Sequence, residues 1–592
     1  LSAGSASLVQ AQQPVLKEEL IVTGQREARN EAIDLYRDSD SITNFIASDA
    51  MGQFVDQNVA ESLQRLQGVS ISHDQGEGRF VSVRGVSAGL SSVSINGMRI
   101  GTPEDGSRAV PLDVIPTGSV ELIEITKVPT PDMPGDAIGG AVNVKSGSAF
   151  DYDGDTFRYR AEGSYNELSE KTSPKLQANY TDVVNAFGGS ENFGISLGAN
   201  FLDREFQSDN IEAEYYENDD LGEPVKALQE VQLRKYYVNR ERIGANVNLE
   251  YRPDDTSRYY MNTVFSRFSD AETRQRSIYV FEDGTLADFD GNNGTFEDIA
   301  EDGFRRRIRF RTKEQDTTAL ALGGEHIMES MELDYQLGYS VTREKVPDET
   351  EGRFEYQTQE LDGEFTIGQG IPSFRILNQG VEDTSHLNHA EYLLDRVVLE
   401  PKFIDDDDLN FSANALFRDA FGQRNFSLKT GIDFRAKSKD VDVNEIELRD
   451  VPELGLEPYT IGEPDYPFAN LGEGISESMF LSDFYADRDA FQIRPQDEDE
   501  ARELQQAEDF VADEEVLAGY LMGTWQADNW QLIAGARVEY TDYSATGNQL
   551  EFDENGDLSI TSRSVESDYS NVLPGLHYRY NLSDDMVLRA AW

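Results

Sequence analysis

From about residue 154 onward, the sequence consists of segments in which apolar and polar side chains alternate, and this pattern constrains the fold most strongly. In residues 332–341 (ELDYQLGYSV), every second side chain is Leu, Tyr or Val, and those between them include Glu, Asp and Gln. A period of two residues indicates β-strands with one apolar face. Each segment runs for about 9–11 residues, the length of a tilted strand that spans a membrane. The alternation recurs in residues 245–251, 409–417, 426–434 and 532–540.

Charged side chains in the middle of these strands favour a membrane barrel over a soluble β-sandwich. Arg537 and Glu539 lie within one strand, and Lys429 and Asp433 lie within another. A water-filled or plugged lumen would solvate such groups. A secreted, soluble β-rich binding protein is the alternative, since its strands also alternate.

The lengths of the connections between strands also favour a membrane barrel. Residues 527–530 and 582–586 form tight turns, whereas residues 270–303 and 442–508 are long connections. Outer-membrane barrels have short periplasmic turns and long external loops. We expect 14 or 15 strands, at the precision such boundaries allow. Because Trp592 ends a strand without a closing turn, we also expect that further strands follow.

Composition excludes several classes of function. The 592 residues include 111 acidic and 52 basic side chains, a formal charge of −59, so no nucleic-acid partner is expected. Without cysteine, disulfides and Cys-based metal sites are excluded. No run of about 18 apolar residues exists, so no transmembrane helix is expected.

Residues 51–150 have the pattern of a compact α+β unit that precedes the strands. Residues 59–69 place apolar side chains at helical spacing and include a stop at Gly68. Short strands are expected at residues 69–72, 80–84, 91–96, 120–128 and 141–145.

Several residues of this unit suit particular backbone roles. Gly85 follows Arg84, and Gly97 follows Asn96, at strand ends where a positive φ is expected. Arg84 and Lys127 are expected to pair either with acids of the lumen or in plain surface salt bridges. A Pro/Gly loop holds three glycines that would let the backbone approach the barrel wall closely or simply form turns: Gly135, Gly139 and Gly140.

One short strand near the N-terminus has no obvious partner. Residues 18–26 (EELIVTGQR) contain the apolar run Leu20–Val22 and a stop at Gly24, between polar, irregular segments. An unpaired extended segment can add to the sheet edge of another protein through backbone hydrogen bonds. Residues 1–11 are similar to the end of a signal peptide, with small residues and a Val9-Gln10-Ala11 ending.

Taken in order, these segments resemble TonB-dependent outer-membrane receptors over essentially the whole chain. EELIVTGQR resembles the TonB box. NVAESLQRLQGVSIS, FVSVRGVSAGLSSVSINGMRI and IPTGSVELIEITKVPTPDMPGDAIGGAVNVKS resemble successive segments of the plug domain. The form PTPDMPGDAIGGAVNVK is similar to a large subgroup with long barrels that is often associated with carbohydrate uptake.

The resemblance implies a mostly β fold: a transmembrane antiparallel β-barrel with an N-terminal α+β plug in its lumen, located in the Gram-negative outer membrane. Barrels of this family have about 22 strands, so roughly a third would be absent here. The implied organisation is a signal-peptide remnant (1–11), the TonB box and a flexible linker (12–50), the plug (51–150) and an incomplete barrel (151–592).

The resemblance also implies the partners: TonB of the inner membrane, outer-membrane lipid, and a small-molecule or oligosaccharide ligand. TonB would pull on the box, tug the plug through residues 25–50 and open a path. A signalling receptor with an additional N-terminal domain is disfavoured because residues 12–50 are too few to hold one. The residues expected to bind TonB are Glu19, Leu20, Ile21, Val22, Thr23 and Gly24.

Ligand contacts are expected where plug loops meet the barrel wall. The loops 72–79 and 99–109 carry the candidates His73, Asp74, Gln75, Arg99, Glu104, Asp105 and Arg108, although these side chains would also suit plain solvated loop tips. Aromatic and acidic side chains in residues 442–508 suit neutral sugars by stacking and hydrogen bonding, and an acidic mouth would repel anionic ferric chelates. Composition therefore favours an oligosaccharide over a ferric siderophore. The aromatic residues in question are Tyr459, Tyr466, Phe468, Phe480, Phe484 and Tyr485.

No motif predicts an enzyme, a cofactor or a metal site. GVSAG (85–89) fits the G-x-S-x-G nucleophile pattern, but a strand follows it where that motif requires a helix. DFDGNNG (288–294) and DENGD (553–557) lack the glycine and glutamate spacing of a calcium loop. His386 and His389 have H-x-x-H spacing without a third ligand.

Overall fold

A computed structural model describes most of the chain beyond residue 29. The described ranges are 30–47, 58–115, 120–152, 154–222, 224–368, 370–553, 557–583 and 586–592. The expected signal remnant and the expected TonB box (18–26) lie outside these residues. None of the described helices is long and apolar enough to cross a membrane.

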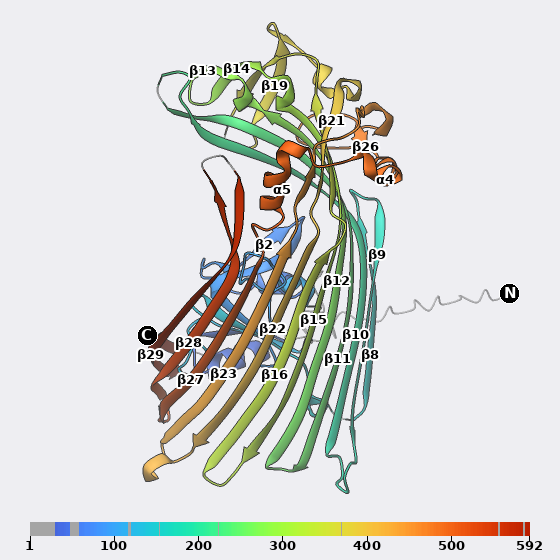
Figure 1. The fold of residues 1–592 in the computed structure, drawn as a ribbon. Coiled ribbons are helices and arrows are strands. Elements are labelled where there is room, and N and C mark those ends of the chain that lie inside the picture. The colour runs from blue at the N-terminus through green and yellow to red at the C-terminus, as the bar shows by residue number, and fades with distance from the viewer. Residues whose placement is uncertain are drawn as a thin grey trace, which may run out of the picture.

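A large antiparallel sheet curves round the N-terminal unit and forms the wall of the molecule (Figure 1). Within the described residues, thirteen strands follow one another from β30 at one edge to β8 at the other, close to the 14 or 15 expected. The strands are β8 (Thr156–Asn166), β9 (Lys171–Val184), β10 (Phe193–Asn218), β11 (Val225–Asp254), β12 (Ser257–Val280), β15 (Phe304–Ile327), β16 (Met331–Val346), β22 (Lys402–Phe417), β23 (Phe426–Val443), β27 (Phe510–Gln526), β28 (Trp530–Phe552), β29 (Leu558–Ser583) and β30 (Met586–Ala591).

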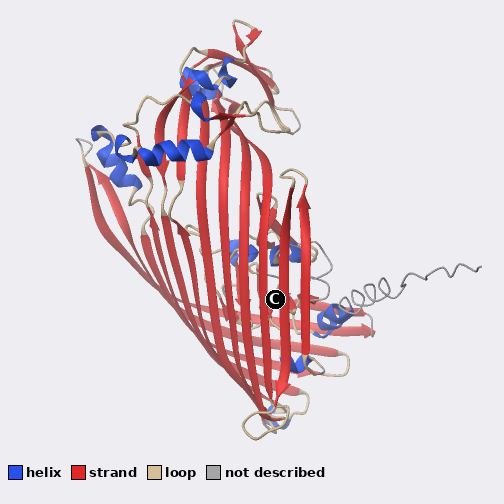
Figure 2. Cartoon of the chain, turned by 90° about the vertical axis from the view of Figure 1, so that its right-hand side faces the viewer, coloured by secondary structure: helices blue, strands red, loops and turns tan. Residues whose placement is uncertain are grey.

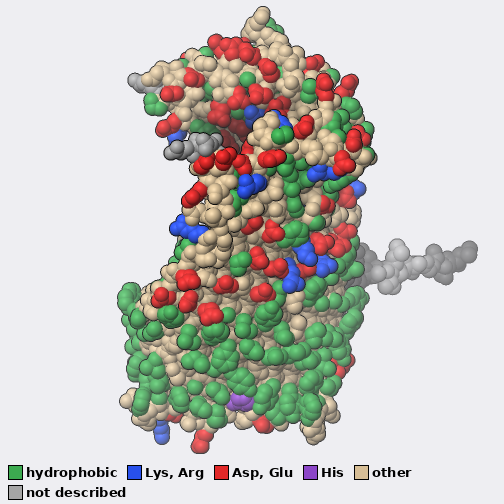
Figure 3. All heavy atoms as spheres, viewed as in Figure 1, with side chains coloured by type: hydrophobic (Ala, Val, Ile, Leu, Met, Phe, Trp, Pro, Cys, Tyr) green, Lys and Arg blue, Asp and Glu red, His purple; other side chains and the backbone are tan. Residues whose placement is uncertain are grey.

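Burial in this wall is inverted relative to a soluble sheet. On β16, Leu337 and Tyr339 are 46% and 47% exposed, whereas Ser340 and Thr342 are buried. A broad band of hydrophobic side chains covers the lower part of the molecule in Figure 3, and charged side chains gather above it. An apolar outer face and a polar lumen are what a lipid-facing barrel wall requires. The predicted alternation is confirmed, and the soluble sandwich is disfavoured because it would bury its apolar face.

The two ends of the wall differ as predicted. At one end the connections are short, such as residues 255–256 between β11 and β12 and residues 527–529 between β27 and β28. Aromatic rings gather near this end, where Phe187, Tyr251 and Tyr259 follow one another at centroid distances of 5.1 and 6.4 Å. Such rings mark a membrane interface. This end is therefore the periplasmic one, and the long connections are external.

The plug is a small α+β unit on the concave side of the wall, whose edge strands β8 and β30 do not pair with each other within the described residues. Its main sheet has the order β1-β6-β7-β4-β5, beside the hairpin β2-β3 and the helix α3. The expected helix and strands are confirmed, but β1 lies in the range expected to be linker and pairs with β6. The plug elements are β1 (Thr43–Ala47), α3 (Val59–Leu63), β2 (Val69–Asp74), β3 (Glu77–Val83), β4 (Ser91–Ile95), β5 (Met98–Arg99), β6 (Leu122–Thr126) and β7 (Gly140–Lys145).

Both tight turns of the plug have the expected backbone. Asn96 and Gly97 have φ values of 52° and 80°, so both central residues of the β4-β5 hairpin turn adopt the left-handed conformation that Asn-Gly favours. Arg84 and Gly85 also have positive φ values, 56° and 74°. The Arg84 side chain donates to a backbone carbonyl, that of Lys127, at 3.4 Å.

The close approach expected for the loop glycines holds at one position. A Cβ at Gly135 would lie 2.3 Å from the Leu573 side chain of β29, so this glycine brings the plug directly against the wall. The expectation is wrong for Gly139 and Gly140, whose nearest neighbours belong to the plug itself. A Cβ at Gly139 would meet the side chains of Ser91 and Val86. A Cβ at Gly140 would meet the carbonyl of Thr126 and the side chain of Val83.

The external connections form a folded cap with its own apolar core, where loops were expected. A 5-stranded sheet, β13-β14-β18-β19-β20, and a branch of β17, β21 and β24 extend the wall at this end (Figures 1 and 2). The cap elements are β13 (Thr285–Phe289), β14 (Asn293–Ile299), β17 (Thr350–Tyr356), β18 (Leu361–Thr366), β19 (Ser373–Asn378), β20 (Val381–Glu382), β21 (Tyr392–Leu399), β24 (Ile446–Leu448), β25 (Thr460–Ile461), β26 (Gly474–Ile475), α4 (Glu477–Ala486) and α5 (Glu498–Leu504).

Candidate functional site

A buried ionic network joins the plug hairpin β2-β3 to the wall. Glu77 of β3 accepts hydrogen bonds from Arg240 (3.0 Å) and Arg242 (2.6 Å) of β11, and also pairs with Arg204 of β10. Arg240 also binds Asp270 of β12 at 2.9 Å. The side chains of Glu77 and Asp270 are fully buried. Burial alone would raise the pKa of Glu77, but the guanidinium groups around it hold that pKa far below its usual range.

The first candidate ligand loop is attached to the same wall. Asp74 and Gln75 both bind the Arg240 guanidinium, at 3.1 and 2.6 Å, and Gln75 donates to Glu272 of β12. His73 is exposed. Asp74 and Gln75 therefore already have partners on the wall.

The candidate residues of the second loop lie in two separate places. Arg79 connects it to the first loop, since its guanidinium binds both Asp74 (3.3 Å) and Glu104 (2.5 Å). Asp105 pairs with Lys402 of β22 at 2.7 Å. Arg99 and Arg108 instead line a cavity on the other side of the plug. The seven candidates do not form a single cluster, and sequence analysis missed Arg79, which links them.

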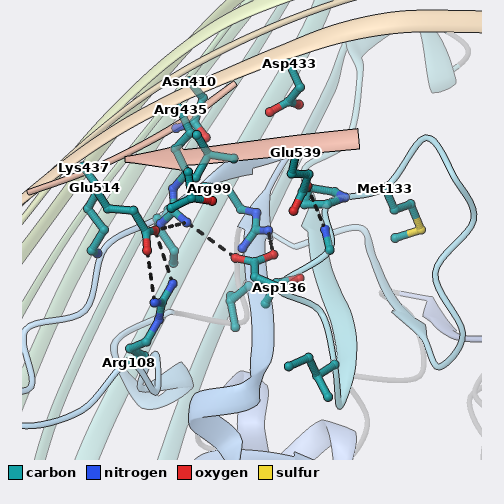
Figure 4. Close-up of a pocket in the computed structure, with 18 of the residues that line it drawn as sticks. Arg99, Arg108, Met133, Asp136, Asn410, Asp433, Arg435, Lys437, Glu514 and Glu539 are labelled. Carbon is teal, nitrogen blue, oxygen red and sulfur yellow. Dashed lines mark hydrogen bonds and ion pairs between the residues drawn. The ribbon is translucent and has the colours of Figure 1, made fainter. Parts of the chain in front are cut away.

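The cavity lies between the plug and strands β22, β23, β27, β28 and β29 (Figure 4). Its volume is about 510 Å³, within the range of small-molecule pockets. Arg99 binds Asp136 across the plug surface, and Arg108 reaches Glu514 of β27 at 3.3 Å. Arg435 of β23 lies 3.5 Å from Asp136. Burial would raise the pKa of Asp136, but Arg99 and Arg435 lower it to about 2.

Five arginines of β12 and β15 form a second charged site above the plug, here called the arginine cluster. On β12 they share a face with Glu272, which binds the plug residue Gln75, so they point into the lumen. The register places Arg274 opposite Arg309, and Arg276 opposite Arg307. The members of the cluster are Arg274, Arg276, Arg307, Arg309 and Arg311.

The arginine cluster has more positive than negative charge. Its acidic partners are Glu272, Glu349 and Glu351, three carboxylates against five guanidinium groups. The Nε atoms of all five arginines are buried and have no hydrogen-bond partner within the described residues. Buried donors normally find an acceptor. The cluster therefore carries excess positive charge and buried donors that its own carboxylates do not satisfy.

Several of the aromatic residues expected to stack on sugars are buried in the cap. Tyr459, Phe480 and Phe484 are at most 2% exposed and belong to the core of the cap. Phe468 and Tyr485 remain 38% and 57% exposed. The expected stacking surface is thus reduced to these two and to Tyr466, which is partly buried against the same core.

The two histidines of the H-x-x-H pair are also part of the cap. His386 packs against the rings of Tyr279 and Phe304, and His389 shares a hydrogen bond of 2.7 Å with Thr460. Both are buried. Burial lowers the pKa of His386 to about 4 and that of His389 to about 3. Across the part of the chain that the structure describes, no group of three or more potential metal ligands is present.

A plug on the concave side of a lipid-facing antiparallel wall, with charged sites between them, is the architecture of a plugged outer-membrane β-barrel receptor. Residues 36–141 match the family described as TonB-dependent Receptor Plug Domain, and residues 482–591 match the Outer membrane protein beta-barrel family. The chain thus carries the plug domain of TonB-dependent receptors and, beyond it, strands of a β-barrel of the Gram-negative outer membrane. No curated protein matches its sequence.

A solved receptor structure supports the fold. The chain is similar to the ferric-catecholate import receptor Fiu from E. coli, with 12% identity and a TM-score of 0.51, over 93% of this chain and 64% of that one. The ferric yersiniabactin uptake receptor FyuA from Yersinia pestis matches with 14% identity and a TM-score of 0.47, over 92% and 63%. The chain thus spans less than two thirds of the length of either receptor. At these identities the likeness shows the fold alone.

Proposed function

We propose that this protein carries out TonB-dependent uptake of an anionic ligand, with a ferric siderophore as the leading class. The arginine cluster carries the proposal, because a net positive, partly desolvated site above the plug suits carboxylate, catecholate or phosphate oxygens. TonB would bind Leu20–Gly24 and supply the mechanical work, since the strand-like segment has the form needed for sheet-edge addition.

A neutral oligosaccharide is the second candidate. The exposed rings of Phe468 and Tyr485 favour it, because aromatic faces stack on sugars. A neutral sugar would not be attracted by the excess positive charge of the arginine cluster.

Uptake by cells carrying the full-length gene tests the proposal. An anionic triscatecholate ferric chelate, a neutral hydroxamate ferric chelate and a maltodextrin are compared, each radiolabelled, with and without TonB. We expect TonB-dependent uptake of the anionic chelate alone. Uptake of maltodextrin alone would overturn the anionic assignment, and uptake that does not require TonB would overturn the mechanism.

Neutralising one arginine tests whether the charge of the cluster contributes to ligand uptake. R276Q should weaken uptake of the anionic chelate about tenfold or more, since about 1.4 kcal/mol corresponds to a factor of ten in affinity. R375Q is the matched control, because Arg375 lies on the cap surface with its side chain 63% exposed. Equal effects of the two substitutions would contradict the role of the cluster.

A further inference from the structure

A second cavity lies between the plug and the wall near the periplasmic end, and it is here called the periplasmic pocket. Its volume is about 320 Å³, at the lower end of the range of small-molecule pockets. Arg258 of β12 and Glu325 of β15 line it beside the short turns at residues 255–256 and 328–330. Their side chains are 33% and 47% exposed, so the pocket opens towards the periplasm.

Amide side chains from the plug and from two neighbouring strands meet in the periplasmic pocket. Asn248 of β11 and Asn262 of β12 lie directly opposite each other in the register of the wall, and both line the pocket. Asn96, in the β4-β5 turn of the plug, donates to the Ser146 hydroxyl at 2.9 Å, and Asn248 donates to the same hydroxyl at 2.8 Å. Plug and wall therefore share one uncharged polar network at this pocket.

Two of these amides keep hydrogen-bonding capacity for a ligand. Asn248 is only 7% exposed, and its side-chain oxygen is buried without a hydrogen-bond partner within the described residues. The Asn262 side chain makes no hydrogen bond to any other residue that the structure describes. Buried polar atoms normally have a partner, so the Asn248 oxygen indicates an acceptor site for a donor group of a bound molecule.

The charges that line the periplasmic pocket compensate one another. Two basic and two acidic side chains line it: Lys145, Arg258, Glu250 and Glu325. Arg258 pairs with both Glu250 and Glu325, at 3.0 and 2.9 Å, and Lys145 pairs with Glu124 of β6 at 2.6 Å. Unlike the arginine cluster, the pocket therefore has no excess charge to attract an anion, and it suits a neutral ligand.

We propose that the periplasmic pocket binds a neutral N-acetylated sugar presented from the periplasm, the chemistry of a cell-wall glycan. An acetamido group has one N–H donor and one carbonyl acceptor, which the oxygen of Asn248 and the NH₂ group of Asn262 can match. An extended peptide suits the pocket less well. Strands β10, β11, β12 and β15 each have a paired neighbour on both sides, so they leave no sheet edge for a peptide to join.

This site is separate from the proposed uptake of an anion. The arginine cluster lies above the plug, whereas the periplasmic pocket lies at the other end of the lumen and opens towards the periplasm. A sugar bound there would contact the plug through Asn96 and the wall through Asn248 at the same time. The site would thus attach the receptor to periplasmic glycan, whatever cargo the receptor carries.

Binding of small sugars to the purified full-length protein tests the proposal. The protein is kept in an amine-oxide detergent, because maltoside and glucoside detergents carry sugars of their own. Chitotriose, which is N-acetylated, and maltotriose, which is not, are titrated by calorimetry. We expect chitotriose to bind with a Kd of about 1 mM or tighter, and maltotriose to bind at least about tenfold more weakly, which corresponds to about 1.4 kcal/mol. Equal binding of the two sugars would overturn the N-acetyl assignment, and binding of neither would overturn the site.

Co-sedimentation with purified cell-wall sacculi identifies the source of the sugar. Retention on sacculi that free chitotriose competes away would identify the intact cell wall. Chitotriose binding without retention would support the same site with soluble glycan fragments as its ligand. Retention that chitotriose does not reduce would contradict the proposal, because the contact would then lie elsewhere on the molecule.

Variants at Asn262 connect the binding to the pocket. N262L keeps nearly the shape of the side chain but removes its hydrogen-bonding groups, so it should weaken chitotriose binding about two- to tenfold. N262W fills the pocket and should abolish binding. N239L is the matched control, because Asn239 lies on β11 at an exposed position outside the pocket.

Heat-dependent migration of each variant on a gel verifies that its barrel is folded, and N262L decides the test if N262W does not fold. Chitotriose binding that N262L leaves unchanged, or that N239L weakens equally, would overturn the assignment to this pocket. Uptake of a ferric chelate is measured separately. Its absence would refute the proposed cargo and leave the sugar site standing.

Discussion

Replacing Glu77 by Gln should loosen the plug more than any comparable change on its other side. Glu77 is fully buried and compensates Arg240 and Arg242, which are themselves at most 3% exposed. An amide has almost the same shape but no charge, so E77Q leaves guanidinium groups without their counter-ion. Breaking a buried pair in this way costs about 3–5 kcal/mol. Separation of the plug from β11 and β12 should become roughly 100- to 3,000-fold more frequent, at about 1.4 kcal/mol per factor of ten.

Thiol labelling measures this opening directly. Ser266 lies beneath the plug and is 3% exposed, so a cysteine there becomes reactive when the plug leaves β12. The S266C variant is purified in detergent, and its maleimide labelling rate is compared with and without E77Q in a series of urea concentrations. Ser→Cys is a small change, which keeps the reporter close to the native packing.

D136N provides the matched comparison, because it also converts a carboxylate to an amide at a plug–wall contact. Asp136 has a side chain that is 34% exposed, and its wall partner Arg435 lies 3.5 Å away. Because water still reaches the Asp136 carboxylate, its loss should cost less than that of Glu77 and should accelerate S266C labelling less than E77Q does. If D136N accelerates labelling as much as E77Q does, the greater cost assigned to the buried Glu77 network is refuted.

Three further expectations concern other parts of the molecule. I21P should abolish TonB-dependent uptake and leave ligand binding to whole cells intact, because proline removes a backbone donor from the strand that TonB would pair with; unchanged uptake would contradict this. F480A should destabilise the cap by about 3–5 kcal/mol in hydrogen exchange, whereas F468A, at an exposed ring, should have little effect. For His386 and His389, burial lowers the pKa to about 4 and about 3, below the about 6.5 of an unfolded histidine. The stability they contribute is therefore present above pH 6.5 and lost as the pH falls towards 4, which limited proteolysis of the cap between pH 7 and pH 4 would detect; constant protection would contradict it.

Local sequence patterns predicted the wall and the plug turns because their causes are local. Alternation in residues 332–341 gives a strand with one apolar face whatever its neighbours are. Asn96-Gly97 selects its turn through the φ preferences of two adjacent residues. The inverted burial also followed from sequence, since charges such as Arg537 in mid-strand require a polar lumen.

The cap and the arginine cluster depend on register between distant segments, which alternation alone does not fix. Arg274 and Arg309 are opposite one another only once β12 and β15 pair. The signal was present in residues 304–311 (FRRRIRFR), where Arg recurs at alternate positions, but its meaning required the partner strand. Phe480 was assigned to ligand stacking because its position in a long connection gave no sign of an apolar core around it.

The formal charge of −59 and a proposed anionic cargo are compatible once charge is considered by location. Repulsion from exposed carboxylates falls off over about 8 Å at physiological ionic strength, because salt screens charges in water. The arginine cluster is partly desolvated, so its attraction is screened much less. Under the proposed function, the local charge above the plug would select the ligand, and the net charge of the chain would not. The expectation that an acidic mouth excludes ferric chelates rests on surface carboxylates, whereas the proposed anionic cargo rests on the arginine cluster, so Arg276 is a more informative position to neutralise than any acid of the cap.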